Sequence, residues 1–189
     1  MRAFENRIAA LDGGIDAVAV GSGMAAVSYA LLSVAEGGGR IIAPTNLYGA
    51  SIDAFQSIFP KFGIHVDFVD DINDFEAVKA AIKTDTKAVF VESVANPSTD
   101  IADIEQLATI AHQAGIPLIV DNTFPTPYLL RPFDFGADID VYSSTKAING
   151  MVTSCRGSSL IMVNLTGTMA GFRNLLKMNL RWKRRLANQ

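Results

Sequence analysis

Two short apolar segments, PLIVD at residues 117–121 and DIDVY at 138–142, are each followed by side chains that can carry out chemistry. The first segment ends in Asp121, and the second runs directly into SSTK at 143–146. Similar apolar runs alternate with helical patterns along the chain, which is typical of a mostly parallel sheet with helices on both faces. Because ligands of such sheets bind at the carboxyl ends of the strands, we expect these two groups of side chains to meet.

Seven segments have the length and composition of strands, and helical periodicity falls between them. The segment 24–35 is apolar almost all round, which predicts a buried helix. Another helix is expected around Phe75, with Asn73 and Glu76 spaced as its N-cap and reciprocal partner. The sequence therefore predicts an α/β fold, a three-layer α/β/α arrangement around a mostly parallel seven-stranded sheet. Its expected strands are 17–20, 40–43, 65–69, 88–92, 117–121, 138–142 and 158–163.

The composition bounds the class of protein. With 189 residues, 49% of them hydrophobic, the chain can bury one sizeable core, so one domain is expected. The net charge of -3 gives no overall attraction to nucleic acid or to an anionic membrane, and no apolar stretch is long enough to span a bilayer. Cys155 is the only cysteine, which excludes an intrachain disulfide and a cysteine-based zinc cage. These features predict a soluble, cytoplasmic protein with no nucleic-acid, membrane or metal partner.

An amine and a carboxylate at the ends of neighbouring strands suit pyridoxal 5'-phosphate (PLP). The amine of Lys146 can form a Schiff base with the aldehyde of PLP, and a buried Asp121 can keep the pyridine nitrogen protonated. The expected strand 17–20 runs into GSGMAA at 21–26 and then into a helix, which predicts an anion site for the phosphate. The same motif fits a nicotinamide dinucleotide, but the next expected strand, 40–43, does not end in the acidic residue that would hold a ribose.

Seven motifs follow one another along the first 150 residues. They are FENRIAALDGG at 4–14, GSGMAA at 21–26, NLYGAS at 46–51, VESVANP at 91–97, VDNTFPTP at 120–127, GADI at 136–139 and SSTKAING at 143–150. In order and wording they resemble the Cys/Met-metabolism family of fold-type I PLP-dependent enzymes. The resemblance implies that Lys146 binds the cofactor covalently, that Asp121 pairs with the pyridinium and that Tyr48 stacks on the ring, so these three are the expected catalytic residues. It further implies phosphate binding by Gly23, Met24, Ser143 and Thr145, and a position near the ring hydroxyl for Asn96.

The same resemblance implies a PLP-dependent transferase of sulfur amino-acid metabolism. Its expected reaction is γ-replacement on an O-acetylhomoserine-type substrate with sulfide or a thiol, and elimination of the methionine γ-lyase or cystathionine lyase type is the alternative. It also implies a homo-oligomer, a PLP-binding large domain at 1–163 and, at 164–189, part of a linker helix to a C-terminal domain. A basic amphipathic helix that binds a partner or a surface is the other interpretation of 164–189. Because family members extend beyond both ends of the chain, a non-catalytic fragment and one part of a split enzyme with a complementing chain are further alternatives.

Overall fold

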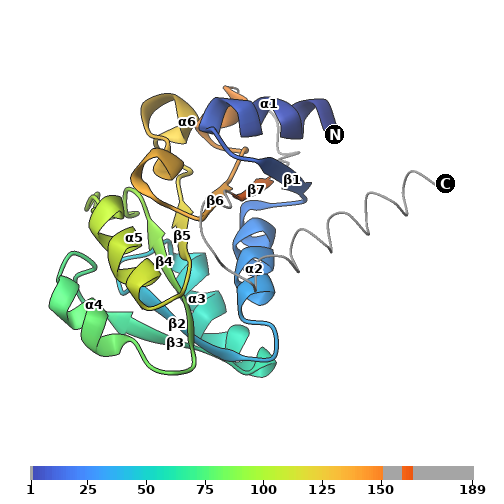
Figure 1. Cartoon of the computed structure of the whole chain (residues 1–189). Coiled ribbons are helices and arrows are strands. Elements are labelled where there is room, and N and C mark those ends of the chain that lie inside the picture. The colour runs from blue at the N-terminus through green and yellow to red at the C-terminus, as the bar shows by residue number, and fades with distance from the viewer. Residues whose placement is uncertain (1, 151–158, 164–189) are drawn as a thin grey trace.

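One mixed sheet organises the part of the chain that the computed structural model describes, residues 2–150 and the backbone of 159–163 (Figure 1). Its strand order is β1-β7-β6-β5-β4-β2-β3. The five strands from β6 to β3 are mutually parallel, whereas β7 runs antiparallel to both β6 and β1. The strands are β1 Asp16–Val20, β2 Gly39–Pro44, β3 Ile64–Val69, β4 Thr86–Glu92, β5 Leu118–Asp121, β6 Ile139–Tyr142 and β7 Ser159–Val163. The predicted mostly parallel sheet is therefore confirmed, and each strand lies within two residues of its expected position.

Helices cover both faces of this sheet, which confirms the three-layer arrangement (Figure 1). On one face α1, α4 and α5 contribute apolar side chains to a core that includes Val89 and Val91 of β4. On the other face α2 and α3 pack on a second core that includes Ala88 and Phe90 of the same strand. This alternation follows from the two-residue period of a strand, which points successive side chains to opposite faces. The α-helices are α1 Arg2–Asp12, α2 Gly23–Val34, α3 Gly49–Ser57, α4 Phe75–Ala81, α5 Ile104–Gln113 and α6 Thr126–Leu129, and the 3-10 helices are η1 Phe59–Phe62, η2 Pro132–Phe135 and η3 Ala147–Asn149.

Two local expectations were wrong. The helix α2 is not buried all round, because Tyr29 remains 54% exposed while Ala26, Ala30 and Leu31 are buried. The N-cap of α4 is Asp74 rather than Asn73, and the side chain of Asp74 accepts a hydrogen bond from the backbone of the third helical residue. Asn73 instead joins a loop distant in sequence: it donates to the Ile101 carbonyl and accepts from the Asp103 N–H.

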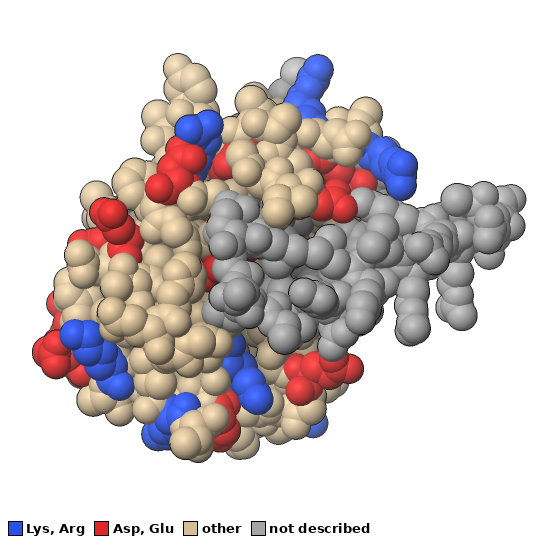
Figure 2. Space-filling model, viewed as in Figure 1, with Lys and Arg blue, Asp and Glu red and all other residues tan. Residues whose placement is uncertain are grey.

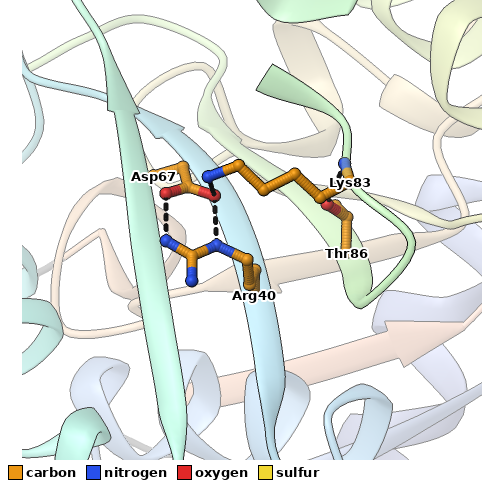
Figure 3. A network of polar contacts seen from close by, with 4 residues as sticks. All are labelled: Arg40, Asp67, Lys83 and Thr86. Atoms are coloured by element: carbon orange, nitrogen blue, oxygen red, sulfur yellow. Dashed lines mark hydrogen bonds and ion pairs between the residues drawn. The ribbon is translucent and has the colours of Figure 1, made fainter. Parts of the chain in front are cut away.

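An ion-pair network ties β2 to β3 and to the turn before β4 (Figure 3). Arg40 of β2 donates through Nε and Nη2 to the two carboxylate oxygens of Asp67 in β3. Lys83 Nζ lies 3.0 Å from Asp67 Oδ2, and its backbone N–H donates to the hydroxyl of Thr86 at 2.8 Å. The Arg40 guanidinium, helped by the Lys83 ammonium, lowers the pKa of Asp67 to about 2. Two parallel bonds add geometric specificity to the charge attraction, so this pair helps to fix the register of the edge strand β3 against β2.

A buried polar cluster lies between the end of α1 and β6. The Tyr142 hydroxyl donates to Asp12 Oδ1 at 2.9 Å and accepts from the Asn122 amide at 2.9 Å. Asp12 Oδ2 and both carboxylate oxygens of Asp140 have no hydrogen-bond partner among the described residues. Burial raises the pKa of Asp12 to about 6 and raises that of Asp140 well above its usual range, where the neighbouring Asp12 adds to the effect. Two buried carboxyls that face each other are accommodated best when they share a proton.

The surface carries charges of both signs. On the face shown in Figure 2, acidic and basic side chains are interspersed over the described residues. Within the same part of the chain, no helix is both long enough and apolar enough to cross a lipid bilayer. No group of three or more histidine, cysteine, aspartate or glutamate side chains there is arranged to hold a metal ion.

Candidate functional site

A pocket of about 420 Å³ opens at the carboxyl ends of the parallel strands. Strands β4 and β5 contribute their last residues, the loop after β6 contributes three polar side chains, and α2 contributes its first turn. This is the place where open α/β sheets bind ligands, because the chain leaves the sheet there and helix N-termini converge. All eight residues expected at the site line this one pocket: Gly23, Met24, Tyr48, Asn96, Asp121, Ser143, Thr145 and Lys146.

The N-terminus of α2 forms one wall of the pocket. Ser22 is the N-cap, and its hydroxyl accepts a hydrogen bond from the Ala25 N–H at 3.1 Å. A helix start presents further backbone N–H groups and a partial positive charge, so it favours an anion. Gly23 permits close packing here, because a Cβ atom at this position would lie 2.9 Å from the Cβ of Ser143. The strand-to-helix turn and the loop after β6 are therefore in contact at the pocket wall.

The loop after β6 brings two hydroxyls and an amine to the pocket beside the start of α2. Ser143 Oγ and Thr145 Oγ1 lie 2.8 Å apart, and the Ser143 N–H donates to the Thr123 hydroxyl at 2.8 Å. The backbone N–H of Lys146 bonds the Ser143 carbonyl at 3.1 Å, which closes a tight turn. The Lys146 amine has no ion-pair partner among the described residues. Hydroxyls beside a helix N-terminus suit a phosphate, and an unpaired amine suits a nucleophile.

Asp121 lies at the floor of the pocket, where β5 ends. Its Oδ1 accepts the Thr123 N–H at 3.0 Å, and no basic side chain of the described residues pairs with it. Removal from water raises the pKa of Asp121, whereas the hydrogen bonds from Thr123 lower it. A half-buried carboxylate with a raised pKa is stabilised by a cation or by an N–H donor placed in the pocket.

Tyr48 and Asn96 come from the loops after β2 and β4. Tyr48 is the N-cap of α3 and is 47% exposed. Asn96 precedes Pro97 in a cis peptide bond and is half-buried. A carboxylate joins them, because Glu92 Oε1 accepts the Tyr48 N–H at 2.8 Å and Glu92 Oε2 accepts the Asn96 N–H at 3.0 Å. The two loops are thus held across the end of β4.

Several pocket residues were missed by the sequence reasoning. Glu92 is the most important, and the signal that found Asp121, an acid that ends an apolar strand, applies equally to Glu92. Ser22 could have been found from its position as the last residue before a helix start. Thr123 lies two residues after Asp121, a spacing at which a side chain and a backbone amide often bond locally. The other additions are Val27, Ser51, Val94, Phe124 and Ala147.

The residues present fit PLP. The helix start, Ser143 and Thr145 offer a phosphate cradle, Gly23 keeps its walls in contact, and Lys146 offers the amine. The uncompensated carboxylate of Asp121 fits a protonated ring nitrogen, which would supply the missing positive charge. The fold and the pocket together define the class: an α/β protein with a PLP-type site at the carboxyl edge of its sheet.

The comparison with protein families names the group within that class. The family model described as "Cys/Met metabolism PLP-dependent enzyme" matches residues 1–173, so the chain belongs to this family. It is 43% identical over 154 residues to the O-acetyl-L-homoserine sulfhydrylase of Leptospira meyeri, a match that covers 82% of the chain and 35% of the relative. It is 45% identical over 148 residues to the L-methionine gamma-lyase of Fusobacterium nucleatum subsp. polymorphum, covering 78% of the chain and 37% of the relative. The chain thus spans about a third of the length of the curated relatives it matches.

A solved structure extends the likeness to the fold. The chain superposes with a TM-score of 0.83 on a structure named for the O-acetylhomoserine (thiol)-lyase of Campylobacter jejuni, at 34% identity. The match covers 87% of the chain and 40% of that structure, which contains a lysine carrying a pyridoxyl phosphate group. The family and the structural likeness confirm the sequence-based assignment to PLP-dependent enzymes of sulfur amino-acid metabolism.

Proposed function

We propose that residues 1–163 are the PLP-binding part of an enzyme that carries out γ-replacement on an O-acetylhomoserine-type substrate, with sulfide or a thiol as the incoming group. The observation that carries this proposal is that eight residues from five separate sequence motifs line a single pocket at the carboxyl edge of the sheet. Several relatives with this substrate in their names support the choice of substrate.

The proposed roles of Lys146, Asp121 and Tyr48 follow from the chemistry of their side chains. When bound, PLP supplies an aldehyde for amines and a ring that withdraws electrons. Lys146 provides the amine that holds the cofactor and, once released, a base for the α-proton of the substrate. Asp121 maintains a proton on the ring nitrogen, because a carboxylate partly removed from water stabilises a nearby positive charge. Tyr48 presents an aromatic face for the ring and a hydroxyl that can move a proton at the substrate.

The phosphate site is proposed at the start of α2. Gly23 and Met24 line the pocket together with Ser143 and Thr145, and Gly23 packs directly against Ser143. Charge-assisted hydrogen bonds from backbone N–H groups and hydroxyls orient an anion and hold it in place. Asn96, on the loop after β4, is proposed to contact the ring hydroxyl.

The test is covalent labelling of the purified chain. PLP added to the chain should give an absorption band in the visible range, and borohydride reduction with peptide mapping should place the pyridoxyl group on Lys146. The Lys146→Ala variant should lose both signals, whereas Lys61→Ala, a lysine outside the pocket, should keep both. Label spread evenly over surface lysines would contradict the proposal.

Elimination is the second candidate, because relatives named as methionine gamma-lyases share 43–45% identity with the chain, as much as the Leptospira sulfhydrylase does. The two reactions use the same cofactor site and differ in the substrate that binds. Addition of O-acetylhomoserine or of methionine to the PLP-loaded chain separates them, since the substrate that is accepted changes the visible spectrum at lower concentration.

We also propose that the chain works in the cytoplasm in association with further polypeptide, either as a homo-oligomer or with a complementing chain. Exposed apolar side chains support association: Phe124, which lines the pocket, is 62% exposed, and Tyr128 and Leu129 of α6 are 92% and 75% exposed. Apolar surface of this kind is usually covered by a partner. Light scattering coupled to size-exclusion chromatography tests the association, and a monodisperse monomer would contradict it.

A further inference from the structure

Glu92 connects two loops that carry proposed ligands of the cofactor ring. Its side chain is 8% exposed and lines the pocket at the end of β4. Each carboxylate oxygen accepts one backbone N–H: that of Tyr48 at 2.8 Å and that of Asn96 at 3.0 Å. The two donors lie 48 residues apart in the sequence but meet on one side chain. A substitution at Glu92 would therefore change the contacts of both loops while leaving the side chains of Tyr48 and Asn96 in place.

A second contact joins the same loops farther from the sheet. The Asn46 amide donates to Asp100 Oδ2 at 2.6 Å and to Ser98 Oγ at 3.2 Å. Asn46 belongs to the loop that carries Tyr48, and Ser98 and Asp100 belong to the loop that carries Asn96. With two points of attachment the loops are held as one unit, and Glu92 is the attachment that lies inside the pocket.

We propose that Glu92 is a positioning residue, whose two carboxylate oxygens hold Tyr48 and Asn96 at the correct separation around the cofactor ring. This inference rests on the proposed function, because the ring is the PLP ring. Two N–H donors aimed at one carboxylate are satisfied when both oxygens accept, and charge-assisted bonds of this type are stronger than neutral ones. The proposal adds a residue for which the motifs implied no role.

The ionised form of Glu92 is the form that holds both loops. A protonated carboxyl carries a hydrogen on one oxygen, and that O–H opposed to an N–H donor makes a weaker hydrogen bond than a carboxylate oxygen does. Burial raises the pKa of Glu92 to about 7, and the nearby Asp121 of β5 adds to this, while the two N–H groups oppose it. The other titratable groups of the pocket are Tyr48 after β2 and Lys146 after β6. A positively charged ring bound above Asp121 would favour the ionised Glu92, so cofactor binding and loop positioning support each other.

The experiment measures PLP affinity and the circular dichroism that the protein induces in the cofactor's visible band. In Glu92→Gln the amide nitrogen faces one of the two N–H donors, so we expect at least a tenfold weaker PLP affinity and a reduced induced signal. Glu76→Gln is the matched control, because Glu76 is an exposed glutamate on α4 that pairs with Lys79 and does not line the pocket. It should leave both readouts unchanged.

A double-mutant cycle separates positioning from a general loss of structure. The variants Tyr48→Ala and Asn96→Ala remove the side chains that Glu92 is proposed to position but keep the backbone N–H groups. In the background that carries both, Glu92→Gln should weaken PLP binding less than twofold. A tenfold effect that persists in that background would overturn the positioning role.

Two further outcomes are distinguishable. A wild-type chain that binds no PLP overturns the proposed function and this inference together, whereas normal PLP binding by Glu92→Gln overturns the inference alone. Because Glu92 is buried, a loss of structure in Glu92→Gln would also lower the affinity, so Glu92→Asp serves as a second variant. It keeps the charge, but its shorter side chain cannot reach both N–H donors, so the same loss of affinity is expected. Unfolding of both variants, detected by far-UV circular dichroism, would assign Glu92 to fold stability and overturn the proposal.

Discussion

Replacement of Gly23 by alanine should separate the two walls of the pocket. The added Cβ would lie 2.9 Å from Ser143 Cβ and 3.1 Å from Ser143 Oγ, whereas ordinary van der Waals contact begins at 3.4 Å. The start of α2 and the loop after β6 must therefore move apart by about half an ångström. Overpacking of this size costs about 1–3 kcal/mol, and the higher helix propensity of alanine returns less than about 1 kcal/mol. We expect a net loss of about 1–2 kcal/mol in the free energy of unfolding.

The assay compares two alanine substitutions in the same turn. Gly21→Ala is the matched control, because a Cβ at Gly21 meets no heavy atom within 4 Å and the residue has no left-handed φ. For Gly23→Ala, thermal unfolding should show a fall of about 3–6 °C in Tm, and Gly21→Ala should stay within about 1 °C of wild type. PLP affinity should fall about tenfold in Gly23→Ala alone, because the displaced Ser143 hydroxyl is a proposed phosphate ligand. Equal Tm and equal PLP affinity in the two variants would refute this account of the pocket wall.

Three further predictions concern buried and paired carboxylates. Asp67→Asn removes the charge that Arg40 pairs with and should lower the free energy of unfolding by about 1–2 kcal/mol at pH 7. Because the folded pKa of Asp67 is below the unfolded value, this difference between variant and wild type should vanish as the pH falls from about 4 towards 2. Urea titrations at pH 7 and near pH 2 check it. Glu92 has a raised folded pKa, so the folded state binds an extra proton between pH 4.5 and about 7. As the pH rises through that window, the free energy of unfolding of the wild type, measured by urea titration, should therefore fall more steeply than that of Glu92→Gln. Asp140→Asn should stabilise the chain at pH 8 and much less at pH 5, because folding of the wild type must take up the shared proton, which costs more as the pH rises, whereas the amide needs no such proton and can donate to Asp12; a variant less stable than wild type in urea titrations at pH 8 would contradict the shared-proton description.

The sheet could be predicted from the sequence because its strands are short, apolar and bounded by polar residues or glycine. The two-residue alternation that places Val89 and Phe90 on opposite faces is a backbone property, so it needs no tertiary information. The meeting of Asp121 and Lys146 was equally predictable, since residues that follow parallel strands emerge at one edge. The expected first residue of β5 was one too early, because Pro117 has no N–H to donate to the ladder.

The errors arose where tertiary contacts decide between local alternatives. Asn73 and Asp74 are both good N-cap residues, and the choice fell on Asp74 because a loop near Ile101 engages the Asn73 side chain. Glu92 ends an apolar strand as Asp121 does, but its role could not be predicted, because its partners are backbone N–H groups, which leave no mark in the residue types of the two loops. The expectations for residues 164–189 lie outside the described part of the chain, as does Cys155.

The pairing of β1 makes the order of synthesis matter for the site. Among the described strands β1 pairs with β7 alone, and Asp16 lies opposite Val163, so the first strand of the chain enters the sheet only through the last. The turn that follows β1 begins with Gly21 and leads into the proposed phosphate site. During synthesis the five parallel strands can pair before β7 has been made, whereas β1 cannot pair until β7 is present. The β1 side of the anion-binding turn is therefore anchored only after β7 has been made, although α2 already packs on β4 and β6, and contacts of such long sequence separation form slowly.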